Sequence, residues 1–136
     1  MAGNVLVDAG FVVALLSRRD SHHGWAVAEA GRFPQPWKTC EAALSEAFHL
    51  LGPRGAPALR TLLRRGAIVV DFGLVANLDA VLALMEKYAD APASLADAAL
   101  VRMTETLDSS MILTTDADFR IYRRHGRHVI PCRIPS

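Results

Sequence analysis

The stretch MILTTDADFR, residues 111–120, joins a predicted strand to a group of carboxylates and points to where the chemistry lies. Its first residues, Met111 to Leu113, are apolar and predict a short buried strand. Two threonines and two aspartates follow in close order, although an ordinary turn after a strand needs no carboxylates. If other elements bring carboxylates to the same place, this strand end is one part of a shared site.

Length and composition predict one globular domain over residues 1–136. The chain has 136 residues, of which 51% are hydrophobic and 21% charged, which is enough apolar material for a core. Its apolar runs fall short of the ~18 residues that a membrane span needs. The early run VLVDAGFVVALL is interrupted by Asp8 and has no basic segment before it, so we expect neither a signal peptide nor a membrane anchor. Cys40 and Cys132 form no metal-binding or disulfide pattern, and we expect reduced thiols and a cytoplasmic protein.

The net charge of +1 gives no overall basic field that would indicate nucleic-acid binding. Most basic residues are arginines, however, and nine of the thirteen arginines fall in two groups, one between residues 54 and 65 and the other between residues 120 and 133. Arginine suits bidentate contacts with phosphate, although solvated helix faces would explain the same pattern.

Apolar strands alternate with amphipathic helices along the whole chain. We expect strands at 4–7, 67–70, 111–114 and 128–132, helices at 10–16, 21–30, 41–51, 56–65, 74–88, 95–107 and 117–124, and an extended segment or loop at 34–40. Strands that are apolar throughout and alternate with helices belong to parallel sheets covered on both faces. The predicted fold is therefore an α/β class, three-layer α/β/α sandwich around a central, mainly parallel sheet.

Three aspartates directly follow or closely trail predicted strands. They are Asp8, Asp71 and Asp116, and in such sheets ligands bind outside the carboxyl ends of the strands. Asp8 and Asp116 could each simply cap the helix that follows. Asp118 would then lie in the first turn of its helix and favour the helix dipole.

Two further acids lie on predicted helices. Ser94 and Asp97 form an S-x-x-D pattern that favours a capping box, but Asp97 also shares a helix face with apolar residues, where an uncompensated carboxylate is costly. Glu41 and Glu46 border the two sides of the apolar stripe of their helix, and periodicity does not decide between them. A solvated position is the default for either glutamate.

Taken together, these acids come from separate elements and could meet near one edge of the sheet. Carboxylates that converge in this way favour Mg²⁺ or Mn²⁺, which prefer oxygen ligands. Such an ion can lower the pKa of a bound water and neutralise a phosphoryl oxygen. The pattern therefore indicates a divalent-metal site to which the end of the strand at 111–114 contributes one part.

Four stretches carry a resemblance to a known family. They are VLVDAGFVVALL, TCEAALSEAFHLL, ASLADAALVRMTETL, and ILTTDADF with the RIYRRHG that follows. In order and spacing they resemble the PIN domains, and among these the VapC-like toxins of bacterial toxin–antitoxin pairs. The resemblance extends over nearly the whole chain and implies Mg²⁺- or Mn²⁺-dependent hydrolysis of RNA, an antitoxin partner that covers the site, and a homodimer.

The resemblance also implies which acids do the work. The family's acidic quartet matches Asp8, Glu46 rather than Glu41, Asp97 and Asp116, which would be both the metal ligands and the catalytic residues. Thr114, Asp118 and Ser94 would support them from outside the ligand set. We further expect Arg120, Arg123 and Arg124, on the helix predicted at 117–124, to contact RNA phosphates.

Two positions depart from the family pattern. A serine or threonine commonly follows the first aspartate, where this chain has Ala9, and many relatives carry an aspartate where this chain has Ser94. The first departure keeps a different class of function open, a PIN-like module that binds RNA or protein with weak or no catalysis. Metal binding without RNA turnover would favour that module over the nuclease.

Other enzyme and signalling classes fit less well. A receiver domain needs paired acids after its first strand and a lysine after its last, and a haloacid-dehalogenase phosphatase needs an aspartate where Gly10 stands. Neither phosphate-cradling glycine motif occurs. The sequence leaves open which RNA is cut, which of the two metals is used, and whether Ala9 and Ser94 reduce activity.

Overall fold

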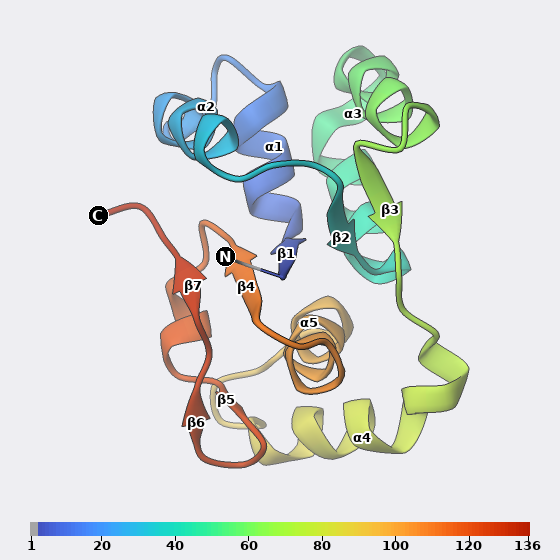
Figure 1. Cartoon of the computed structure of the whole chain (residues 1–136), viewed down its shortest axis with the longest axis vertical. Helices are drawn as coiled ribbons and strands as arrows, with labels where there is room; N and C mark the ends of the chain where they lie inside the picture. The colour runs from blue at the N-terminus through green and yellow to red at the C-terminus, as the bar shows by residue number, and fades with distance from the viewer. Residues whose placement is uncertain (1–2) are drawn as a thin grey trace.

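A five-stranded parallel sheet forms the centre of the molecule (Figure 1). The computed structural model describes residues 3–136. The strand order is β3–β2–β1–β4–β7, with β1 (Asn4–Val7), β2 (Trp37–Thr39), β3 (Ile68–Val70), β4 (Ser110–Leu113) and β7 (Cys132–Arg133). The expected parallel sheet is confirmed, and β1 lies at its centre.

Helices cover both faces of this sheet, as the alternating pattern predicts. The elements are α1 (Ala9–Leu16), α2 (His23–Arg32), α3 (Glu41–Arg64), α4 (Leu74–Lys87), α5 (Leu95–Thr106) and the short 3₁₀ helix η1 (Ala117–Arg120). α1 packs against both α2 and α3, and α4 packs against α5 on the other side (Figure 1). The result is the expected three-layer α/β/α arrangement.

The side chains of β1 alternate between two apolar cores. Val5 and Val7 pack with residues of α1, α2 and α3, while Leu6 packs with residues of α5 and η1 on the opposite face. Successive side chains of a strand point to opposite faces, so a strand buried on both sides is apolar at every position. This is why the run before Asp8 contains no polar residue after Asn4.

Several predicted boundaries in the first half of the chain are shifted. The segment 34–40, predicted as extended or loop, contains the strand β2 at residues 37–39, and the helix predicted at 21–30 begins at His23 and runs through Gly31 to Arg32. The helices predicted at 41–51 and 56–65 are two halves of α3, which is kinked at Gly52. Gly52 has φ 65° and ψ −172°, a conformation that glycine adopts without steric cost, so the predicted break appears as a kink.

The helix predicted at 117–124 and the strand predicted at 128–132 are confirmed only in part, because the helix is shorter and the strand is interrupted between His128–Val129 and Cys132–Arg133. The helix stops after one turn, and Arg123–Arg124 form β5, which pairs antiparallel with β6 (His128–Val129). His125 and Gly126 take positive φ at the turn between them. Pro131 cannot donate a hydrogen bond, and beyond it the chain leaves the hairpin and joins the main sheet as β7.

The apolar face of α4 is only partly covered. Val81 is buried, whereas Leu78 and Leu82 are each 44% exposed and Val75 is 93% exposed.

None of the helices within residues 3–136 is both long enough and apolar enough to cross a membrane. Cys40 and Cys132 are free thiols.

Candidate active site

Asp8 lies at the carboxyl end of the central strand and caps the helix that follows. Its Oδ1 accepts a hydrogen bond from the Ala9 N–H at 2.7 Å. Because β1 and β4 are parallel neighbours in register, Asp8 lies beside Thr114, whose hydroxyl donates to Asp8 Oδ2 at 2.8 Å. The capping role expected of Asp8 is thus confirmed, and each of its oxygens has a donor.

The two residues after Asp8 are small for separate reasons. Ala9 is buried. Its side chain has no hydroxyl, and the hydroxyl that contacts Asp8 comes from Thr114 instead. A Cβ on Gly10 would collide with the Thr115 hydroxyl, so glycine lets the end of β4 approach the first turn of α1. This close approach brings Thr114 to Asp8.

Burial and neighbouring acids make the charge on Asp8 unfavourable. Asp8 is only 5% exposed. Its pKa is raised from 3.8 to about 7. Burial is the largest cause, and the negative charges of Asp97 and Glu46 add to it, while the hydrogen bonds from Thr114 and Ala9 act in the opposite direction. A cation beside Asp8 would stabilise its ionised form.

Asp97 both caps α5 and faces the site. The Ser94 hydroxyl accepts from the Asp97 N–H at 3.0 Å, and Asp97 Oδ2 accepts from the Ser94 N–H at 3.1 Å, so the predicted capping box is present. The pKa of Asp97 is raised, mainly by burial and next by the charge of Asp116. Within the described chain, Asp97 Oδ1 has no hydrogen-bond donor and is free for another ligand.

Tyr122 is a site residue that no sequence motif indicated. Its ring is fully buried between Phe119 and Tyr88, and its hydroxyl donates to Asp97 Oδ2 at 3.4 Å. Burial and the nearby Asp97 raise the pKa of Tyr122, which keeps the hydroxyl protonated and able to donate. Only its place in the RIYRRHG stretch, next to Phe119 of the last acidic motif, could have drawn attention to it.

Asp116 and Asp118 follow β4 in a tight turn. The Asp116 N–H donates to the Thr114 hydroxyl at 3.0 Å, and Asp116 Oδ1 accepts from the Asp118 N–H at 2.9 Å. Asp116 therefore caps η1, as one interpretation of the sequence predicted, while its charge reaches Asp97. Asp118 is exposed and supports the turn through its main chain.

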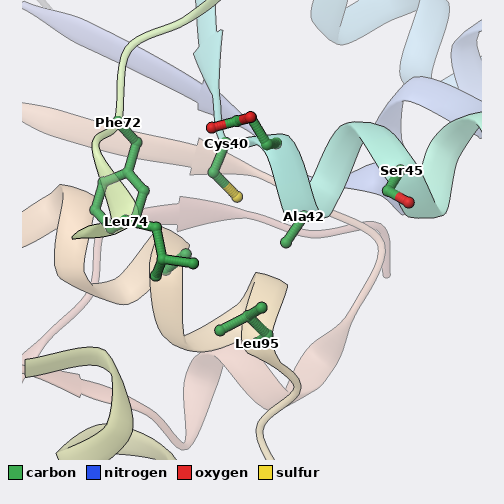
Figure 2. Close-up of a pocket in the computed structure, with 8 residues that line it drawn as sticks. Cys40, Ala42, Ser45, Phe72, Leu74 and Leu95 are labelled. Atoms are coloured by element: carbon green, nitrogen blue, oxygen red, sulfur yellow. The ribbon is translucent and has the colours of Figure 1, made fainter. Parts of the chain in front are cut away.

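Glu46 and Glu41 have different neighbours, which the sequence could not establish. Glu46 is exposed on α3, and its charge contributes to the raised pKa of Asp8. Glu41 instead lines an apolar cavity of about 310 Å³ next to Cys40, with Phe72, Leu74 and Leu95 on its other walls (Figure 2). The charge of Asp8 helps to raise the pKa of the Cys40 thiol, although burial is the main cause, so this cavity borders the acids.

The four predicted acids interact electrostatically, but their carboxylates do not converge on one point. The charges of Glu46 and Asp97 raise the pKa of Asp8, and the charge of Asp116 raises the pKa of Asp97. The four acids lie in or next to four separate elements of the fold. Within residues 3–136, no three acidic, histidine or cysteine side chains are grouped tightly enough to hold a metal ion. The donor chemistry nevertheless fits Mg²⁺ or Mn²⁺, because the donors are carboxylate oxygens and a buried acid among them carries an uncompensated charge.

Asp71, the remaining strand-end acid, is separate from this group. It follows β3 at the edge of the sheet, is exposed, and forms an ion pair with Lys38 at 2.9 Å. Its neighbour is a cation from β2, not another acid.

Two of the three arginines expected to contact phosphates are bound to the main chain. Arg123 Nη1 donates to the carbonyl oxygens of residues 120, 121 and 122, and Arg124 Nη2 donates to the Thr104 carbonyl near the end of α5. Arg120 is exposed, and its side chain makes no hydrogen bond or ion pair within the described residues. Arg120 is therefore the member of the three whose guanidinium remains available to an external ligand.

We expect Arg124→Ala to lower the free energy of unfolding by about 1–3 kcal/mol, because the Thr104 carbonyl loses a charged donor at a helix end. Arg120→Ala, which removes the same group from an exposed position, should stay within about 0.5 kcal/mol of the wild type. Urea denaturation followed by circular dichroism measures both. Equal stabilities of the two variants would show that the Arg124 contact contributes little.

Comparisons with known proteins identify a family and a fold. A family model described as "PIN domain" matches residues 5–124. Among solved structures, the chain is similar to VapC20 of Mycobacterium tuberculosis, described as a toxin that cleaves the sarcin–ricin loop, with a TM-score of 0.76, 20% sequence identity, and coverage of 85% of this chain and 92% of that one. A search of curated proteins finds no match. At this identity the structural similarity establishes the fold.

Proposed function

The chain belongs to the PIN domain family, and from this premise we propose that it is a metal-dependent endoribonuclease that acts as the toxin of a toxin–antitoxin pair. The observation that carries the proposal is the environment of Asp8. A buried carboxylate at the end of the central strand lies in the fields of Glu46 and Asp97, with its pKa raised to about 7. A protein keeps such a group where a cation can compensate it.

Asp8, Glu46, Asp97 and Asp116 would hold one or two Mg²⁺ or Mn²⁺ ions. When bound, such an ion supplies a more acidic water and neutralises charge on the phosphoryl oxygens. The protein's own contribution is orientation. Thr114 and the Ala9 N–H fix Asp8, while Ser94 and Tyr122 occupy Oδ2 of Asp97 and leave Oδ1 free.

The surroundings of the quartet supply the remaining roles. Asp118 holds Asp116 through its main-chain N–H, and Thr114 links Asp8 to Asp116 by accepting from the Asp116 N–H. Arg120, exposed at the end of η1, would contact an RNA phosphate. Glu46, which makes no hydrogen bond among residues 3–136, is free to approach a metal or its bound water.

The proposed partners are a cognate antitoxin and a second copy of the chain, with RNA in the cytoplasm as the substrate. The exposed Val75, Leu78 and Leu82 lie along one face of α4 and support a protein interface, because contiguous exposed apolar surface is typical of interaction sites. The resemblance supplies the identity of the partners.

Incubation of total cellular RNA with the purified protein tests the activity. We expect cleavage with Mn²⁺ or Mg²⁺ and none with EDTA, because the carboxylates alone cannot supply the charge that the metal provides. Discrete fragments on a denaturing gel would identify the RNA. Bound Mn²⁺, detected by calorimetry, without any cleavage would instead support a PIN-like binding module.

A further inference from the structure

A second cavity lies at the other end of α1, away from the acids. It has a volume of about 400 Å³ and is bounded by the end of α1, the turn that follows it and the kink of α3. Three arginines line it, Arg18 and Arg19 from the turn and Arg54 from α3. No acidic residue lines it, and apolar walls are provided by Leu16, Leu50 and others.

The sequence around this cavity is strongly asymmetric in charge. Residues 9–19 and 47–70 contain six arginines and no aspartate or glutamate, although the whole chain carries a net charge of only +1. α1 and α3 pack against each other (Figure 1), and of the six arginines the cavity brings together Arg18, Arg19 and Arg54. Positive charge concentrated in this way attracts polyanions even when the overall charge is near zero.

The three arginines of the cavity have no competing partners. Within residues 3–136, none of their guanidinium groups forms an ion pair or a hydrogen bond, and all three residues are exposed. The nearest acid in sequence, Asp20, accepts a hydrogen bond from the His22 N–H and does not line the cavity. The kink at Gly52 also places Arg54 and Gly55 in the first turn of the second half of α3, where main-chain N–H groups favour anions.

The cavity lies one helix length from the candidate active site. α1 has eight residues, begins directly after Asp8 and ends at Leu16, which lines the cavity. At ~1.5 Å per residue this helix is about 12 Å long, which corresponds to about four nucleotides at the ~3.4 Å spacing of a stacked strand. A single strand of about four nucleotides is therefore long enough to span the distance between the two places.

We propose that the cavity formed by Arg18, Arg19 and Arg54 binds phosphates of single-stranded RNA that extends from the active site along α1. The inference rests on the proposed function for its choice of ligand. The exposed guanidinium groups contact phosphates, and the apolar walls, including Leu50 at 57% exposure, accept a base or ribose face. Contacts of this kind add affinity and fix the strand without reading its sequence.

Binding of a fluorescent 12-nucleotide oligouridylate tests the inference. All proteins carry Asp8→Asn and are measured in EDTA, so that cleavage plays no part. The test variant adds R18Q/R19Q/R54Q, and the control adds R60Q/R64Q/R65Q, which removes the same charge from the far end of α3. We expect the test variant to lose affinity on the order of tenfold and its salt slope to fall by about 2, since each phosphate contact of a single strand contributes ~0.7.

The two variants together make the result decisive. A larger loss in the test variant than in the control, with both folded by circular dichroism, supports a phosphate site in the cavity. Equal losses would show a diffuse attraction, and no loss would leave the cavity to a protein partner; either result overturns the inference. If the wild type fails to cleave RNA but the arginine-dependent binding persists, the nuclease proposal fails and the RNA site remains.

Discussion

Asp8→Asn should lower metal-dependent RNA cleavage on the order of 10²–10³-fold, the loss typical of removing one preorganised electrostatic group. Asparagine keeps the volume of the side chain and can still accept the Ala9 N–H bond, so the helix cap survives. What disappears is the negative charge that couples to Asp97 and Glu46. Initial rates on a defined RNA, with Mn²⁺ at saturation, measure the effect.

Asp71→Asn is the matched control for this substitution. Asp71 also follows the carboxyl end of a parallel strand, but it is exposed and forms an ion pair with Lys38. Its variant should cleave within about twofold of the wild type, because a change at such an exposed surface position is mild. Full activity of Asp8→Asn, or equal losses in both variants, would remove Asp8 from the site.

Asp8 should also make the metal-free protein less stable as the pH rises. The pKa of Asp8 is 3.8 without the fold and about 7 within it, so between these values the folded state holds a proton that the unfolded state has lost. Stability from this group is therefore complete below about pH 4, decreases up to about pH 7 and is level above it. The full difference is on the order of 4 kcal/mol. Asp97, whose pKa is also raised, acts in the same direction.

Asp8→Asn isolates this contribution. In EDTA, the free energy of unfolding of the variant relative to the wild type should increase by about 2–4 kcal/mol between pH 5 and pH 8, because asparagine has no charge to bury. Urea denaturation at the two pH values measures it. At pH 8, Mn²⁺ at about 100 times its Kd should stabilise the wild type by ~2.7 kcal/mol and the variant much less. A difference between the proteins that stays constant from pH 5 to pH 8 would contradict the assigned burial of the Asp8 charge.

Most elements of the fold follow from local pattern. Apolar runs before Asp8 and Thr114 mark β1 and β4, and the S-x-x-D pattern at Ser94 marks the start of α5. These signals are local, because burial on both faces and helix capping each depend on a few neighbouring residues. The end of the chain was predicted only in part for the same reason. Whether residues 123–133 continue a helix or pair as strands depends on distant partners, such as β4 for Cys132.

The candidate site was predicted only in part. The sequence indicated the four acids, and the structure places Asp8 in the fields of Glu46 and Asp97 and gives Glu41 a different environment in the apolar cavity. It also adds Tyr122, whose hydroxyl reaches Asp97 from 25 residues away. A hydrogen bond between residues far apart in the chain produces no periodic pattern in the sequence. In the sequence Tyr122 cannot be distinguished from an ordinary core residue.

Sequence patterns alone were enough to predict the α/β class, most of the strands and helices, and the acids that follow β1 and β4. These properties depend on interactions between residues near one another in the chain. The tertiary structure was needed to establish which groups meet: Asp71 pairs with Lys38, Arg124 binds the Thr104 carbonyl, and Arg18 and Arg19 lie with Arg54 around one cavity. The physical reason is that parallel strands are joined by helices that cross the sheet, so the neighbours of a side chain at the sheet edge come from remote segments whose packing sets their burial and charge.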